Sequence, residues 1–353
     1  MKTFSQILKN SKYVTTLDGL SNVLNESKEI QIPDTFEKSN LKKLTHIVLI
    51  AETRYNSIYK QNIKLSYADP TKLEYTIKNG KIKVNDGEYE FELSESDKEN
   101  TIVLIRSGFK NPIVVFLIKE IQKLGITILN NPDYVGISSN KFLTALLFEK
   151  YNIPQPKFCL VNSTDINKED HDKLDKKLAS IYKTQNTKTK FVCKILNGHG
   201  GKGVFICSPN NILSILQTIF AIAKDVSVLV QEYLDIQKGD VRAHILTLNG
   251  KQHILDVKMR TKGKSDFRTN LSLGNSVEEY TLSKEQEKIV LAAAKASGLI
   301  WAGVDLLPLE NGKNVIIEIN GAPGTPAEIY ADDLEESNCE FYKKFIEKIN
   351  TLC

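Results

Sequence analysis

Three oxygen-bearing side chains interrupt an otherwise apolar pattern near the carboxyl end of the sequence. Residues 302–308 and 314–320 have the pattern of two short strands, and residues 310–313 between them have the composition of a turn. In paired antiparallel strands, side chains two apart and a partner across the ladder share one face. Ionised groups among such apolar neighbours need a stabilising partner, whereas an edge hairpin would leave them solvated. We therefore expect a magnesium or manganese site, completed by phosphate oxygens, at Asp305, Glu318 and Asn320.

A glycine-rich loop at residues 197–203 separates two strand-like stretches within 191–207, and Lys194 lies near the end of the first. Glycines let the backbone approach a phosphate closely, so that amide N–H groups can donate to it. The loop is not a Walker loop, because no GK[ST] run leads into a helix. It is not a dinucleotide fingerprint either, because a strand follows where that motif needs a helix. Taken alone, it is equally compatible with a glycine hairpin that binds nothing.

A strand end and a cluster of charges follow this loop. Residues 231–234 end an apolar stretch, and such a strand end can offer backbone N–H and C=O groups to an adenine edge. A charge cluster is usually a solvated face, but its combination with a metal hairpin and a glycine loop favours a polyphosphate site. The cluster comprises Asp240, Arg242, Lys258, Arg260, Arg268 and Asn270.

The elements that must position these residues follow an α/β order. Apolar strands are predicted at 45–52 and 101–108, and a helix at 111–125 leads to a further strand, which is the pattern of an open βαβ domain. Residues 1–40 predict helix and loop. Other predicted elements are a hairpin over 74–93, a helix from 138, a charged helix and loop over 163–190, a helix near 210–224, a strand over 226–234, a hairpin over 242–260 that turns at Asn249-Gly250, and helices at 283–298 and the C-terminal tail.

The composition argues against several classes of protein, among them nucleic-acid-binding and membrane proteins. The net charge of +4 arises from 47 basic and 43 acidic residues, which does not favour nucleic acid or membrane as a partner. No stretch is apolar enough to span a membrane. The five cysteines form no CxxC pair and the five histidines are scattered, so we expect reduced thiols, no zinc site and a cytoplasmic location.

Over about residues 100–330, the order and spacing of these motifs resemble those of the ATP-grasp ligases of the RimK type, the ribosomal-protein glutamate ligases. The resemblance implies an ATP-grasp fold: an N-terminal open βαβ domain (1–137), then two α+β subdomains (138–229 and 230–353) that sandwich ATP. It places the adenine at Glu232 and Tyr233. It assigns the phosphates and flexible flap to Lys141, Lys194, Gly200, Gly201, Lys202, Gly203, Asp240, Arg242, Arg268, Thr269 and Asn270, with Lys194, Arg268 and Asn270 as catalytic groups.

The reaction implied is ATP-dependent ligation of a carboxylate to an amine through an acyl phosphate. Two magnesium or manganese ions are expected on Asp305, Glu318 and Asn320. The sequence departs from the family pattern in two places. Residues 272–275, in a segment that helps to hold the acceptor, read Ser-Leu-Gly-Asn where a glycine pair is usual, and the first 100 residues are longer and more divergent. The cationic and hydrogen-bonding residues Arg260, Arg268 and Asn270 favour a substrate that presents a carboxylate, and Arg260 is the candidate to bind it.

Three functions compete at this stage. The first is RimK-like addition of an amino acid, glutamate above all, to a peptide or protein terminus. The second is ligation of small molecules, of the glutathione-synthetase or peptide-maturation kind. The third is a nucleotide-binding module without catalysis, against which the complete metal set and Arg268 argue. A homo-oligomer is compatible with all three.

Overall fold

The computed structural model describes residues 38–52, 58, 61–166, 172–182, 188–197, 203–223, 226–235, 239–261, 276–325 and 334–353, with the backbone alone for 334–339. The chain forms two compact units. One holds residues 157–193 and 206–233, and the other holds residues 38–156, 194–205 and 234–353, each within the described ranges. The helix and loop expected over residues 1–37 lie outside these ranges. The division into three domains at residues 137 and 229 stays a prediction.

The larger unit begins with a parallel sheet in the strand order β2-β1-β6-β7. Alternate residues of its central strands face opposite sides, as a pleated strand requires. Val48 and Val103 face helix α4, whereas Ile47 and Ile102 face a core that includes helix α10. The strands are β1 (His46–Ile50), β2 (Lys64–Ala68), β6 (Thr101–Ile105) and β7 (Thr127–Leu129), and α4 spans Pro112–Lys123. This order confirms the predicted βαβ arrangement and adds β2.

Helix α4 begins and ends as its sequence requires. The Asn111 side chain accepts a hydrogen bond from the Ile113 N–H, and Pro112 occupies the first helical turn, where it needs no N–H partner. Gly125 follows the helix with a φ of 79°. A three-stranded antiparallel sheet packs on the same side as α4. Its strands are β3 (Glu74–Lys78), β4 (Lys81–Asn85) and β5 (Glu90–Ser94), followed by the 3-10 helix η1 (Glu95–Glu99).

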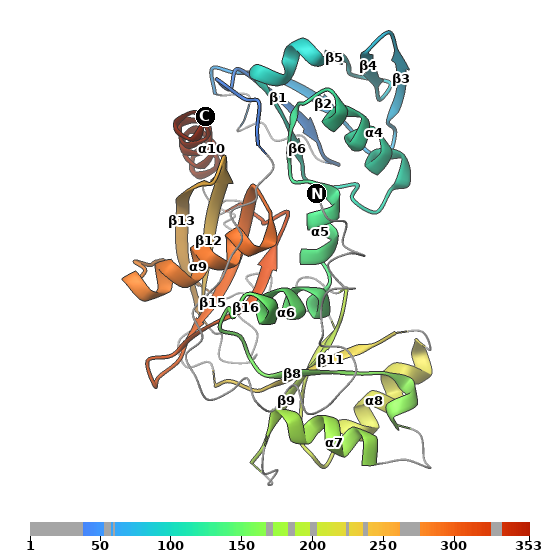
Figure 1. Cartoon of the computed structure of the whole chain (residues 1–353), viewed down its shortest axis with the longest axis vertical. Coiled ribbons are helices and arrows are strands. Elements are labelled where there is room, and N and C mark those ends of the chain that lie inside the picture. The colour runs from blue at the N-terminus through green and yellow to red at the C-terminus, as the bar shows by residue number, and fades with distance from the viewer. Residues whose placement is uncertain are drawn as a thin grey trace. The chain divides into compact units, whose positions relative to one another are not determined.

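The smaller unit is a four-stranded sheet in the order β10-β9-β11-β8. Its apolar core comes from every second strand residue, such as Cys193 and Val230, and from helices α7 and α8, which lie on one side of the sheet (Figure 1). The elements are β8 (Phe158–Val161), the 3-10 helix η2 (Ser163–Ile166), α7 (Asp172–Ile181), β9 (Phe191–Ile195), β10 (Val204–Cys207), α8 (Ile212–Ile222) and β11 (Val228–Glu232).

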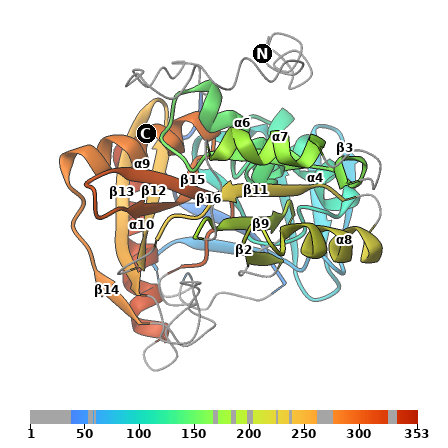
Figure 2. The ribbon, with the colours of Figure 1, turned by 90° about the horizontal axis from the view of Figure 1, so that it is seen from below.

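A five-stranded antiparallel sheet, in the order β14-β13-β12-β15-β16, completes the larger unit. Helix α9 lies on one side of this sheet and α10 on the other (Figure 2). The strands are β12 (Gly239–Leu248), β13 (Lys251–Thr261), β14 (Val277–Glu279), β15 (Trp301–Pro308) and β16 (Asn314–Asn320), and the helices are α9 (Lys284–Ser297) and α10 (Leu334–Leu352). The predicted hairpins over 242–260 and 302–320 are confirmed.

Two short helices connect the parallel sheet to the rest of the chain. They are α5 (Pro132–Ser138), which the sequence did not predict, and α6 (Lys141–Lys150). Asn140 starts α6 by accepting hydrogen bonds from the N–H groups of Phe142 and Leu143. None of the described helices is both long and apolar enough to cross a membrane.

Candidate active site on the five-stranded sheet

The hairpin of β15 and β16 brings the predicted metal ligands together. Asp305 lies directly opposite Glu318, and Gly303 lies opposite Asn320, with an irregularity of the ladder after Asp305. Asp305 is buried, whereas Glu318 and Asn320 are half-buried. The three side chains therefore meet near one end of the hairpin, as the spacing in the sequence predicts.

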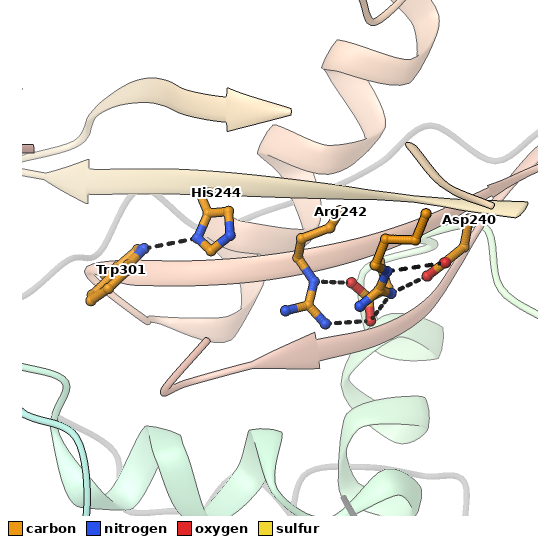
Figure 3. A network of polar contacts seen from close by, with 6 residues as sticks. Asp240, Arg242, His244 and Trp301 are labelled. Atoms are coloured by element: carbon orange, nitrogen blue, oxygen red, sulfur yellow. Dashed lines mark hydrogen bonds and ion pairs between the residues drawn. The ribbon is translucent and has the colours of Figure 1, made fainter. Parts of the chain in front are cut away.

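Strands β12 and β13 surround Asp305 with an ion-pair cluster that we call the arginine–aspartate quartet: Asp240, Arg242, Arg260 and Asp305 (Figure 3). Cross-strand register pairs Arg242 with Asp305 and Asp240 with Arg260. The Arg242 Nε donates to Asp305 Oδ1 and its Nη2 donates to Oδ2 at 2.8 Å. Arg260 donates to both oxygens of Asp240 and lies 2.9 Å from Asp305 Oδ2.

The quartet keeps Asp305 ionised although it is buried. Burial alone acts to raise the pKa of the Asp305 carboxyl, but the neighbouring charges of Arg242 and Arg260 outweigh it and hold the pKa below its ordinary value. Two guanidinium groups face two carboxylates, so the cluster is electrically balanced without a ligand. Removing any one member would leave a buried charge without compensation.

A second cluster, the lysine pair, consists of Lys141 and Lys194 beside Glu318. The Lys141 Nζ lies 3.8 Å from Glu318 Oε1, and the backbone N–H of Lys141 donates to the Leu196 carbonyl. Burial lowers the pKa of Lys194 to about 8; Glu318 acts to raise that pKa and Lys141 acts to lower it. Two ammonium groups thus lie close to each other beside Glu318, an arrangement suited to an anionic ligand.

The donor set around Asp305 fits a hard cation. Asp305 and Glu318 supply carboxylate oxygens, and Asn320 supplies the oxygen of its amide. Within the same residues no group of three or more His, Cys, Asp or Glu side chains could hold a metal by itself. Substrate phosphates would therefore have to complete the shell of a bound Mg²⁺.

The residues expected at the adenine lie in the smaller unit, at the end of β11. The Glu232 N–H donates to the Lys157 carbonyl, and the Glu232 carboxylate accepts from the Lys157 N–H at 2.8 Å. The Tyr233 N–H donates to the Tyr182 hydroxyl, and the Lys190 Nζ lies 5.2 Å from the centre of the Tyr233 ring. Both residues are held by their own unit, and their contact with adenine stays a prediction.

Several predicted site residues fall outside the described part of the chain. Of the glycine flap, the structure describes Gly203, whose φ is 72° and whose carbonyl accepts a hydrogen bond from the Ile195 N–H. The assignments that remain predictions for this reason are Gly200, Gly201, Lys202, Arg268, Thr269 and Asn270.

Two residues that contact Trp301 were absent from the sequence prediction. Asn130 follows β7, and its side chain donates to the carbonyls of Trp301 and Gly321 and accepts from the Trp301 N–H. Arg106 follows β6, and its guanidinium lies 4.9 Å from the centre of the Trp301 ring. A polar residue directly after an apolar parallel strand is the signal that could have identified both.

Comparison with known proteins bears out this architecture. In solved structures, the chain resembles the D-alanyl-alanine synthetase A of Vibrio cholerae with a TM-score of 0.58 and 12% identity, covering 88% of this chain and 99% of the other. It resembles the ATP-grasp ligase PsnB, solved in complex with a phosphomimetic variant of its minimal precursor, Mg and ADP, with a TM-score of 0.60 and 14% identity, covering 86% and 99%. These likenesses confirm the predicted ATP-grasp fold.

Curated relatives are similar over a shorter stretch. The tetrahydromethanopterin:alpha-L-glutamate ligase of Methanocaldococcus jannaschii is 29% identical over 229 residues, which cover 64% of this chain and 70% of the relative. A probable alpha-L-glutamate ligase of Legionella pneumophila is 28% identical over 210 residues, which cover 59% of this chain and 63% of the relative. The model of the RimK-like ATP-grasp domain matches residues 138–334. With the hairpin, the quartet and the lysine pair inside the matched range, the chain belongs to the RimK-like ATP-grasp family of ligases, as the sequence predicts.

Proposed function

We propose that this protein joins the amino group of L-glutamate to a carboxylate of an acceptor, with ATP cleaved to ADP and phosphate. The lysine pair is the observation that carries this proposal, because two ammonium groups close to each other and to Glu318 attract a polyanion such as triphosphate. The relatives described above, which are named as alpha-L-glutamate ligases, support glutamate as the amine.

In the proposed reaction an acceptor carboxylate oxygen attacks the γ-phosphorus of ATP and ADP leaves. The glutamate amine then attacks the acyl carbon, inorganic phosphate leaves, and the proton lost by the amine passes to solvent or phosphate. Lys194 and Lys141 neutralise the transferred phosphoryl group. Because Lys194 is desolvated, its attraction to phosphate is stronger than it would be in water.

The quartet has a positioning role in this scheme. Arg242 and Arg260 fix the Asp305 carboxylate and keep it ionised, so that it can serve with Glu318 and Asn320 as an oxygen donor. Mg²⁺ held there, as two ions in our proposal, would neutralise the charge of the phosphates. Arg268, Thr269, Asn270, Lys202 and the flap glycines complete the nucleotide site in the proposal, with Asp240 acting through Arg260.

The acceptor has two candidate classes. RimK-like ligation would use the terminus of a peptide or protein. The Methanocaldococcus jannaschii relative is named for tetrahydromethanopterin, which favours a small-molecule acceptor as the second candidate. Both acceptors present a carboxylate for activation, so the chemistry at Lys194 and Asp305 is the same.

The experiment is an assay of ADP release and of the mass of the product, with ATP, Mg²⁺, L-glutamate and either peptides that end in glutamate or small glutamylated compounds. We expect a product heavier by one glutamyl residue. Glu318→Ala should lower the rate by about a hundredfold or more, because a metal-binding carboxylate is lost. Glu310→Ala, in the exposed turn of the same hairpin, is the matched control and should leave the rate unchanged. ATP binding without amide formation for any acceptor would instead establish a nucleotide-binding module.

A further inference from the structure

The outer edge of strand β3, which we call the β3 edge, is not covered by any strand in the described part of the chain. The order of the three-stranded sheet is β3-β4-β5, so β3 pairs with β4 on one side only, and Figure 1 shows β3 at the outer side of this sheet. An edge strand presents a row of backbone N–H and C=O groups to which a further strand can add. Residues Glu74–Lys78 therefore offer a site for strand pairing.

The turn between β3 and β4 determines which residues of β3 present these groups. The turn Asn79-Gly80 has φ values of 54° and 72°, as a type I′ turn requires, and Lys78 lies opposite Lys81. The residues that flank such a turn form a hydrogen-bonded pair, and bonded and non-bonded pairs alternate along the ladder. Every second residue, counted back from Lys78, thus bonds to β4, whereas the backbone N–H and C=O groups of Tyr75 and Ile77 point outward.

The β3 edge is complementary to itself. Its sequence is Glu-Tyr-Thr-Ile-Lys, so two β3 strands paired antiparallel about Thr76 place Glu74 of each copy opposite Lys78 of the other. The same register places Tyr75 opposite Ile77, so that their outward backbone groups bond to each other. Within the described residues Glu74 and Lys78 form no ion pair, whereas lysines of β4 pair with glutamates of β5. A second copy would supply the missing opposite charges.

Exposed apolar side chains lie beside the β3 edge. Ile77 is 46% exposed, and Ile113 and Phe116 of helix α4 are 55% and 53% exposed. Tyr75 packs against the core that includes α4, its hydroxyl donates to the Ile113 carbonyl at 3.4 Å, and Phe116 follows one helical turn later on the same face. A second copy would place its Ile77 opposite Tyr75, on the face of the sheet that α4 covers. Burial of this apolar surface would favour the association.

We propose that the chain forms a symmetric homodimer in which two β3 strands pair antiparallel, so that two three-stranded sheets join into one of six strands. A twofold pairing of this kind uses the β3 edge of each copy and closes, which gives a dimer and not a fibre. A strand of five residues with a few apolar neighbours makes a small interface. We therefore expect a dimer that dissociates on dilution.

The test is sedimentation velocity of the full chain over a wide range of concentrations. The wild type should dimerise as its concentration rises. Glu74→Lys and Lys78→Glu should each weaken dimerisation by about tenfold or more, because like charges then lie opposite each other at both ends of the paired strands. An equimolar mixture of the two variants should regain the affinity, as should the double variant Glu74→Lys/Lys78→Glu, because opposite charges face each other again. Glu88→Lys, in the exposed turn between β4 and β5, is the control.

Two further measurements test the apolar contact and the backbone pairing. Ile77→Ser should weaken dimerisation by about tenfold, whereas Ile222→Ser, at an exposed isoleucine of α8, should leave it unchanged. Hydrogen exchange of residues 73–79 should slow as the concentration rises. A monomer at every concentration, a dimer that Glu74→Lys and Lys78→Glu leave intact, or single variants that stay monomeric when mixed would overturn the inference. Recovery in the mixture would show that both variants are folded.

Discussion

The two charge clusters of the site differ in the balance between their positive and negative side chains. In the quartet, Arg242 and Arg260 face Asp240 and Asp305 in short, two-point contacts. In the lysine pair, Lys141 lies 3.8 Å from Glu318, and Lys194 has its pKa lowered to about 8. The first cluster holds equal numbers of opposite charges, whereas the second places two ammonium groups close together beside Glu318.

This difference separates structural support from substrate binding. A balanced, buried cluster contributes to the fold and fixes Asp305 in place, because every charge already has a partner. In the lysine pair the two ammonium groups repel each other until an anion binds. Part of the binding free energy of that anion therefore comes from removing this repulsion. Mutations in the quartet should therefore affect stability and activity together, and mutations in the lysine pair should affect activity alone.

The largest effect is expected for Asp305→Ala. Two guanidinium groups would lose a buried partner, which should lower the free energy of unfolding by about 3–5 kcal/mol and abolish ligation. Urea unfolding and ADP release check the two effects. Full stability in an inactive Asp305→Ala protein would show that the quartet does not support the fold.

Lys194→Gln should give the opposite profile. We expect kcat/KM for ATP to fall by about a hundredfold, because one group that neutralises the phosphoryl oxygens is lost. The melting temperature should stay the same or rise, since a desolvated ammonium is removed. Steady-state kinetics and thermal unfolding check this, with the exposed Lys313→Gln as control. Marked destabilisation would place Lys194 among the structural residues.

Gly239→Ala probes the backbone beneath the quartet. Gly239 has a φ of 152°, and a Cβ atom there would lie 1.9 Å from the Arg260 carbonyl oxygen. The strands β12 and β13 would have to separate beside Asp240 and Arg260, so we expect a loss of about 2 kcal/mol in unfolding free energy. Gly250→Ala, at a turn where no atom lies within 4 Å of the added Cβ, is the matched control for a glycine with positive φ. Equal losses in both variants would mean that strain alone, and not the close approach to Arg260, sets the cost.

The effect that is smallest at neutral pH is a pH dependence of the lysine pair. Because burial lowers the pKa of Lys194 from 10.5 to about 8, the unfolded chain binds more protons than the folded one between these values. The free energy of unfolding should therefore gain a contribution that rises with pH across this window. ATP binding should weaken there, approaching about tenfold per pH unit well above the pKa. Lys194→Arg, which stays charged, should flatten both profiles, and an unchanged wild-type KM for ATP from pH 7 to 10 would contradict the assignment.

The part of the site that lies within one hairpin could be predicted from the local sequence pattern. The part that depends on how distant strands pair could not. The hairpin of β15 and β16 could be predicted because its apolar strands and turn are contiguous in the sequence. The pairing of Arg242 with Asp305 could not, because it depends on which strand lies beside β15 and in which register the two strands pair. The assignment of Arg242 to the nucleotide, which the family resemblance implies, stays a prediction.

The elements of the fold likewise divide into those that could be predicted from the sequence and those that could not. Strand β1 and helix α4 have strong apolar periodicity and were predicted. Strand β2, with the sequence KLSYA, is polar at its start, and its place at the edge of the sheet demands little of its side chains. Helix α5 has seven residues, too few for a helical period to emerge from the sequence.

The core beneath the parallel sheet has a practical consequence for recombinant dissection of this protein. Ile47 and Leu49 of β1 share that core with Phe341 and Phe345 of α10, almost three hundred residues later in the sequence. A fragment that begins at residue 138, where the family match begins, would expose the aromatic side of α10 and the buried end of β12. Apolar surface of that kind promotes aggregation. The start of the family match at residue 138 is thus not a boundary at which the chain can be cut, and fragments meant for crystallisation or for domain exchange must keep β1 and the core that it shares with α10.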